Sequence, residues 1–200
     1  MTDSVYAPPQ ADLTKVHSED SLEAFYVVST LKMMVMFITT MGGYQIYWHY
    51  KNWRRYQEMS LSQGGADGEI WPVARAIFSI FFIHSLFEKV KDHATALQRP
   101  VTFNGPLTAT LMVCIMLAGV PSLFFKTPQA LFVIMVVVMV LVVPMMFMYR
   151  NAQRFINESC GDPEGASNSV LSVANYIWMA VGICYWLYNL SNIRTIAKLI

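Results

Sequence analysis

Few side chains in this 200-residue chain combine a reactive group with an apolar setting. The titratable candidates are Lys32, His49 and His84. An enzyme needs positioned acids, bases, nucleophiles or metal ions, but no Asp or Glu falls inside a long apolar stretch, and the chain has no HExxH, GxSxG or Gly-rich phosphate loop. Paired-carboxylate hydrolysis and proton transport through a buried acid are therefore disfavoured. The sequence predicts a protein that is not an enzyme and has no catalytic residues.

Sulfur-containing side chains are the other candidates, with 14 methionines and 3 cysteines. Thioethers and thiolates are suitable ligands for Cu(I), and Met112 and Met116 flank Cys114. However, Met also fills irregular gaps between helices, and the three cysteines form no CxxC pair. We therefore expect the methionines to serve packing, and we expect no metal site and no cofactor.

The elements that carry these residues are long and apolar. Residues 107–125, 130–149 and 170–193 contain no Asp, Glu, Lys or Arg, and each is about long enough to cross a ~30 Å hydrocarbon core as a helix. Hydrophobic residues make up 55% of the chain and charged residues only 14%, against about 25% in soluble domains. The chain is therefore expected to be an integral membrane protein. Its net charge of +1 gives no reason to expect a nucleic-acid partner.

A further helix is predicted over residues 25–53, with a membrane span at about 30–53. Tyr and Trp favour the headgroup level of a bilayer, and Lys and Arg just beyond it mark the cytoplasmic side. The end of this helix is rich in all of these residue types, and we expect it to be an anchor at the membrane interface. The predicted anchor comprises Tyr47, Trp48, His49, Tyr50, Lys51, Trp53, Arg54 and Arg55.

An amphipathic helix is predicted over residues 72–98. Its uncharged core, 76–87, is too short to span a bilayer. Apolar residues recur at alternating spacings of four and three from Ala76 to Leu97, which favours a helix lying on the membrane or against the bundle. A membrane crossing and a coiled-coil contact stay open as alternatives.

The expected fold is all-α: about four transmembrane helices plus one amphipathic interfacial or re-entrant helix. Spans are expected at about 30–53, 107–125, 129–149 and 170–193, forming a membrane domain over 25–200. Residues 1–24 are polar and are expected to be a disordered tail. Pro121 and Pro144 are expected to kink their helices. Beyond Tyr149, the helix of the third span is expected to continue through the polar residues 150–158, and a loop is expected to begin at Gly161.

Two helix faces carry small or polar residues at helical spacing. Small residues let membrane helices approach closely, and polar residues are expected to face protein rather than lipid. The predicted packing faces are Thr110, Cys114 and Ala118 in the second span, and Asn175, Gly182 and Asn189 in the last.

Orientation follows from the distribution of Lys and Arg. If the 72–98 helix does not cross, nine of these residues share one side against five on the other, which places both termini outside. If that helix crosses, the division is seven to seven and gives no preference.

Several segments resemble a family of small, uncharacterised bacterial inner-membrane proteins, a domain of unknown function. Residues 43–54 read GYQIYWHYKNWR, similar to the GLYxxYWFYKNW-like end of that family's first helix. The segments 71–78 (WPVARAIF) and 84–90 (HSLFEKV) resemble its second block. His49 stands where the family more often has an aromatic residue, and Gly43 where an aliphatic one is commoner. The resemblance implies a bacterial membrane location and a helical fold, and implies no catalytic activity.

Two functions are compatible with these features. The first is a non-enzymatic accessory or scaffold protein, multi-pass in the bacterial inner (cytoplasmic) membrane, that associates through helix packing with another membrane protein or with itself. The alternative is a small oligomeric channel or transporter, with the asparagines of the last span lining a path.

Overall fold

The computed structural model describes residues 24–65, 69–99 and 102–198, and its secondary structure is helical with no β-strand in those ranges. The predicted tail, apart from Ala24, lies outside the described residues. The helices are α2 (Thr30–Thr39), α3 (Tyr44–Ser62), α4 (Pro72–Ile77), α5 (Ser79–Ala96), α6 (Gly105–Met116), the 3₁₀ helix η2 (Leu117–Leu123), α7 (Pro128–Cys160), η3 (Ala166–Asn168) and α8 (Val173–Ala197). The expected all-α class is confirmed.

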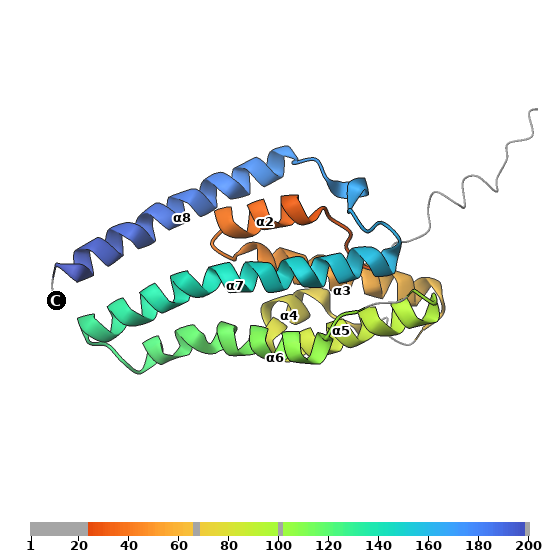
Figure 1. Ribbon diagram of the computed structural model, residues 1–200, viewed down its shortest axis with the longest axis horizontal. Helices are drawn as coiled ribbons and strands as arrows, with labels where there is room; N and C mark the ends of the chain where they lie inside the picture. Colours follow the sequence, from red (N-terminus) through yellow and green to blue (C-terminus); the bar gives the residue numbers. More distant parts are fainter. Residues whose placement is uncertain (1–23, 66–68, 100–101, 199–200) are drawn as a thin grey trace, which may run out of the picture.

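Helix α7 runs along the length of the molecule and divides it into two halves (Figure 1). It packs against α6, η2 and α8 in the apolar part of the molecule and against α2 and α5 toward the other end (Figure 1). The half built from α6, η2, α8 and the first part of α7 is almost free of charge. Most of the charged residues lie on α3, α4, α5 and the end of α7. The fold therefore joins an apolar half to a polar half.

The predicted continuous helix over 25–53 is wrong. The chain instead forms an antiparallel hairpin of α2 and α3, joined by a turn at residues 40–43 (Figure 1). Met41 and Gly42 both have positive φ angles, +52° and +81°, and a helix cannot continue through such a conformation. The Thr40 hydroxyl donates to the Met36 carbonyl (2.7 Å) and accepts from the Tyr44 N–H (2.9 Å), so it closes one helix and caps the next. Neither helix provides the expected 30–53 span.

The amphipathic helix over 72–98 is observed as two helices, α4 and α5, with a break at Phe78. Most of the predicted apolar stripe is buried: Ala76, Ile83, Phe87, Val90 and Ala94 each have at most 2% exposure, while Leu97 at its end is exposed. The stripe packs against α3, α6 and α7. Of the two placements expected for this helix, the structure shows the one against the bundle.

Two helices in the described part of the chain are long and apolar enough to cross a membrane, Gly105–Leu123 and Pro128–Cys160. Only 11% of the most apolar stretch of each is buried inside the protein, although the core helix of a soluble protein would be mostly buried. Pro121 lies within η2, the 3₁₀ end of the first of these helices. Helix α8 is also long, 25 residues, and Gly182 is its one fully buried residue. Four spans are therefore not observed.

Beyond Tyr149, α7 continues through the polar residues 150–158 and ends at Cys160, where Gly161 adopts a left-handed conformation (φ +87°). The predicted end of this helix is confirmed. In the loop that follows, the Asp162 carboxylate accepts hydrogen bonds from the backbone N–H groups of Ala166 (3.0 Å) and Ser167 (2.9 Å). These bonds fix the connection that leads into α8.

Candidate functional site

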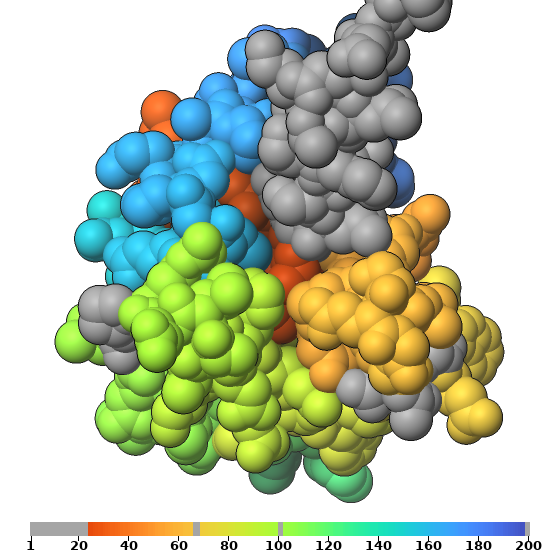
Figure 2. Space-filling view, turned by 90° about the vertical axis from the view of Figure 1, so that its right-hand side faces the viewer, coloured from red at the N-terminus to blue at the C-terminus, as the bar shows by residue number. Residues whose placement is uncertain are grey.

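The first described residues, 24–29, have no regular secondary structure, yet residues 24–28 are buried. Viewed from the polar end of the molecule, this segment lies in the centre, between the surfaces of α3, the region of α5, and the loop that follows α7 (Figure 2). A buried backbone outside a helix or sheet needs hydrogen-bond partners from elsewhere. We call residues 24–29 the core segment.

Three amide side chains supply these partners from α3 and α7. The Asn52 Oδ1 accepts from the Tyr26 N–H (3.2 Å), and the Gln153 Nε2 donates to the Tyr26 carbonyl (2.9 Å). Asn157 makes two hydrogen bonds with the backbone of Val28: its Oδ1 accepts from the Val28 N–H (3.4 Å), and its Nδ2 donates to the Val28 carbonyl (3.0 Å). All three amides are completely buried. They replace the neighbouring strand that an extended backbone would otherwise require.

Asn168, in the loop before α8, completes this arrangement. Its Nδ2 donates to the Val27 carbonyl (2.9 Å), and its backbone carbonyl accepts from the Ser29 N–H (3.3 Å). The Lys32 ammonium group donates to the Asn168 Oδ1 (2.6 Å) and to the Val170 carbonyl (2.7 Å). We refer to Asn52, Gln153, Asn157 and Asn168 as the amide clamp. It ties the core segment to α3, α7 and η3.

A second buried cluster lies where α3 faces α7. The Tyr149 hydroxyl donates to the Gln45 Oε1 (3.3 Å), so the His49 Nε2–H is the group that donates to the Tyr149 oxygen (2.9 Å). The Nδ1 atom of His49 is then an acceptor, and it is buried without a partner, as is the indole N–H of Trp53 one turn later. The rings of Phe37 and Trp48 lie 5.2 Å and 5.1 Å from that of Tyr149, so the cluster is enclosed by aromatic side chains.

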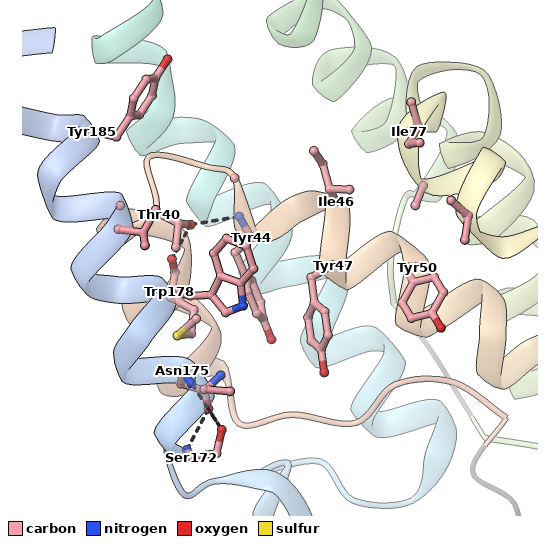
Figure 3. A pocket seen from close by; sticks show the side chains of 17 residues that line it. Thr40, Tyr44, Ile46, Tyr47, Tyr50, Ile77, Ser172, Asn175, Trp178 and Tyr185 are labelled. Carbon is pink, nitrogen blue, oxygen red and sulfur yellow. Dashed lines mark hydrogen bonds between the residues drawn. The ribbon is translucent and has the colours of Figure 1, made fainter. Parts of the chain in front are cut away.

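A pocket of about 690 Å³ lies between α8 on one side and α3 and α4 on the other (Figure 3). Its base is the α2–α3 turn at Thr40 and Gly43, and its walls are mostly apolar and aromatic. Ile77, Trp178 and Val181 line it and are each more than half exposed, so the pocket opens at the protein surface. Its size is typical of small-molecule sites, about 300–1,000 Å³.

The pocket has one polar end. In Figure 3 the hydroxyls of Tyr44 and Tyr47 point toward the end where Ser172 and Asn175 lie, the Tyr50 hydroxyl points away from these two residues, and Tyr185 stands at the other end. These three tyrosines follow one another at i, i+3 and i+6 on α3, which places them along one side of that helix. The pocket is therefore apolar along its length and hydroxyl-lined at one end.

The predicted interfacial anchor is divided between two environments. Trp48, His49 and Trp53 have no exposed surface, so they pack inside the protein and do not face lipid headgroups. For these three residues the anchor prediction is wrong, because α3 is covered by the core segment and by α7 on that side. Tyr47, Tyr50, Lys51, Arg54 and Arg55 are at least partly exposed on the other side of the helix.

The two predicted packing faces are placed differently from each other. Thr110 and Cys114 on α6 are exposed, and Ala118 on η2 is half-buried. At the Thr110 end of this face, the His84 Nε2 of α5 lies 3.1 Å from the Thr110 hydroxyl. On α8, Asn175 and Asn189 are half-buried and Gly182 is buried against the α2–α3 turn. Asn175 forms a capping box with Ser172 at the start of α8, and the Asn189 Nδ2 donates to the Tyr185 carbonyl (2.8 Å).

Sequence analysis did not find the amide clamp. One signal was available, because Tyr149, Gln153 and Asn157 recur at i, i+4 and i+8 and therefore share one face of the helix. These residues lie in the polar stretch that was interpreted only as a continuation of the third span. Asn52 and Asn168 carried no comparable pattern, since their partners are backbone groups distant in sequence.

In comparisons of the chain with protein-family models, with curated protein sequences and with solved structures, nothing matches. Within the described residues, no group of three or more His, Cys, Asp and Glu side chains is arranged to hold a metal ion. Function must therefore be argued from the fold and its surfaces.

Proposed function

We propose that the protein is a non-enzymatic accessory or scaffold protein that is multi-pass in the bacterial inner membrane and associates there with another membrane protein or with a second copy of itself. The observation that carries this proposal is the exposure of apolar surface on α6, α7 and α8. Leu107, Val140, Phe124 and Leu187, for example, are between 54% and 76% exposed. An apolar surface that extends over three long helices needs cover from lipid or from protein.

The arrangement that we favour has three crossings, made by α6 with η2, by α7, and by α8. Helix α8 is long enough, at 25 residues, but it is less apolar than the two candidate spans. In this arrangement the α2–α3 hairpin enters the membrane from one side and returns, as a re-entrant element buried against protein. Charge supports the direction of insertion: α3, α4, α5 and the second half of α7 carry Arg and Lys, against Lys126, Arg194 and Lys198 on the other side. The positive-inside rule then puts the polar half in the cytoplasm.

The partner surface that we favour carries Thr110 and Cys114, which are exposed on α6, and Ala118, which is half-buried on η2. Side chains this small allow the backbone of a second helix to approach closely in lipid, where van der Waals packing drives association. The α8 face is already occupied, since Gly182 meets the α2–α3 turn. The asparagine contacts of α8 also weigh against the channel alternative, because both side chains are engaged with their own helix.

The test combines extraction with native mass measurement. The protein should leave the membrane fraction only with detergent, and gently extracted protein should have the mass of a complex. Cys114→Phe should reduce complex formation by about ten-fold if that face packs. Val140→Phe, an equally bulky change on an exposed position of α7, is the control and should leave the complex intact. Release of the protein by alkaline carbonate, or a monomer in every mild detergent, would refute the proposal.

A further inference from the structure

The pocket between α8 and the α3–α4 pair is not filled by any side chain of its own. Gly182 brings α8 into contact with the α2–α3 turn, because an added Cβ would lie only 2.3 Å from the Thr39 carbonyl oxygen. The Trp186 indole N–H fastens the same helix one turn later by donating to the Ile38 carbonyl (2.7 Å). Toward the start of α8, Trp178 lines the pocket, as does Tyr44 of α3 (Figure 3). The volume therefore persists because α8 packs against α2 and the α2–α3 turn, whereas no contact joins α8 to α3 within the described residues.

Cations stand beside the polar end of this pocket. The Arg54 Nη1 donates to the hydroxyl of Tyr50 (2.9 Å), and the Lys51 Nζ lies 5.6 Å from the centre of the Tyr26 ring. The Tyr26 hydroxyl in turn hydrogen bonds that of Tyr44 (3.2 Å), which lines the pocket. Arg54 thus contacts a tyrosine that lines the pocket, and Lys51 contacts a tyrosine that hydrogen bonds another lining residue.

The positive charge of Arg54 and Arg55 exceeds the negative charge of Glu58, the carboxylate that both contact. Arg54 and Arg55 both reach Glu58, at 2.9 Å and 3.7 Å, so two guanidinium groups share one negative charge. Lys51 adds a third positive charge on the same helix. The site consequently combines an apolar body with a hydroxyl-lined, positively charged end.

We propose that this pocket binds one anionic phospholipid, with an acyl chain between α8 and α3 and its phosphate at Lys51 and Arg54. A basic cluster at the cytoplasmic surface is suited to anionic headgroups, and an acyl chain suits the apolar walls. A transmembrane helix of a partner would match the walls but would place apolar residues against the hydroxyls and the cations. The inference deepens the proposed membrane function and rests on it, since it requires the polar half to lie at the cytoplasmic leaflet.

The experiment is native mass spectrometry of the full chain, purified in a delipidating detergent and then supplied with dioleoyl phosphatidylglycerol or with dioleoyl phosphatidylcholine. We expect one bound phosphatidylglycerol per chain and weaker binding of the zwitterionic lipid. Replacing Lys51 and Arg54 together by Gln should weaken phosphatidylglycerol binding by about five-fold for each cation removed and should abolish the preference between the lipids.

Two matched variants test where the acyl chain of the lipid binds. Val181→Trp places an indole into the pocket and should weaken binding by about ten-fold, whereas Ile183→Trp, a comparably exposed position of α8 outside the pocket lining, should not. Equal binding by wild type and Val181→Trp, equal loss in both tryptophan variants, or a stoichiometric protein that displaces the lipid would overturn the proposal. Detergent-dependent extraction and complex mass are measured on the same samples, so failure of lipid binding alone leaves the proposed accessory function standing.

Discussion

Replacing a buried amide side chain destabilises a protein more when its hydrogen-bond partners are backbone groups than when its partner is another side chain. The partner of Asn157 is the main chain of Val28, whose N–H and carbonyl stay where they are whatever residue stands at 157. An unpartnered buried polar group costs about 1–3 kcal/mol. The amide clamp is therefore the place where a conservative-looking change has the greatest effect on stability.

Asn157→Leu keeps a similar volume but removes both hydrogen bonds to Val28. We expect it to lower the free energy of unfolding by about 2–6 kcal/mol, from about 1–3 kcal/mol for each orphaned group. Thermal unfolding in detergent and hydrogen exchange of the Val28 amide would measure the effect. Asn151→Leu, an exposed position on the same helix, serves as control. Similar melting temperatures in the two variants would contradict the assignment.

Asp162 makes the stability of the α7–α8 connection depend on pH. Hydrogen bonds to its carboxylate from the backbone N–H of Ser167, and secondarily from that of Ala166, hold the pKa of Asp162 below its usual range. A lowered pKa means that the ionised group stabilises the folded state above the unfolded pKa, and that this contribution is lost as pH falls through the folded pKa. We expect the loop to loosen below about pH 4.

Limited proteolysis of the 161–172 loop between pH 3 and pH 7 would measure this change. Wild type should become more susceptible at the acid end. Asp162→Asn should be equally susceptible at both ends, because it has no charge to lose. A wild-type loop whose cleavage rate, corrected for protease activity, does not vary with pH would rule the explanation out.

At the scale of elements, the contact between α8 and the α2–α3 turn depends on a missing side chain. An added Cβ at Gly182 would lie 2.3 Å from the Thr39 oxygen and 2.6 Å from the Thr40 Cα, and both are backbone atoms that cannot rotate away. Gly182→Ala should therefore destabilise the protein by about 1–3 kcal/mol, the usual range for overpacking. Thermal unfolding of the detergent-solubilised variant measures the change.

Gly119→Ala is the matched control, because its Cβ would meet only Val138 Cγ2 at an ordinary 3.8 Å. It should melt within a degree or two of wild type, since surface-like substitutions stay within about 0.5 kcal/mol. If both alanine variants melted like wild type, α8 would not be held against the turn in the way described.

The sequence was sufficient to predict the helical class, the end of α7 at Gly161 and the buried stripe of α5, because each of these depends on local periodicity or on a single helix-stopping residue. The α2–α3 hairpin was missed since hydropathy continues without interruption through Met41, and the turn depends on backbone angles at residues 41 and 42. The pocket could not be predicted for another reason: its walls come from α3, α4 and α8, which only the tertiary fold brings together.

At the scale of the whole molecule, the hairpin changes the expected topology. A crossing at 30–53 would give four spans and put both termini on one side. In the arrangement that we propose, the hairpin returns to its own side, three spans remain, and the core segment and the end of α8 lie on opposite sides of the bilayer. The basic half, with Arg54, Arg55 and Arg99 among its residues, then lies with the start of the described chain.

Fusion reporters would test this topology directly. We expect a cytoplasmic reporter to be active when joined after Gln98 and a periplasmic one when joined after Lys126 or at the C-terminus. Replacing Arg54 and Arg55 together by Gln should reduce the asymmetry and produce a mixed population. A C-terminal reporter that is active only in the cytoplasm would reject the three-span arrangement.

The amide clamp also affects the order in which parts of the protein fold during synthesis. Synthesis begins at the N-terminus, but Gln153, Asn157 and Asn168 follow their backbone partners in the core segment by 127, 129 and 141 residues. At about 5–20 residues per second, the ribosome needs about 6–28 s to reach them. During these seconds only Asn52 is available to the waiting segment. The core segment is therefore fixed almost last, and we expect a nascent chain stopped before Gln153 to leave this segment open to chaperones and to proteolytic quality control.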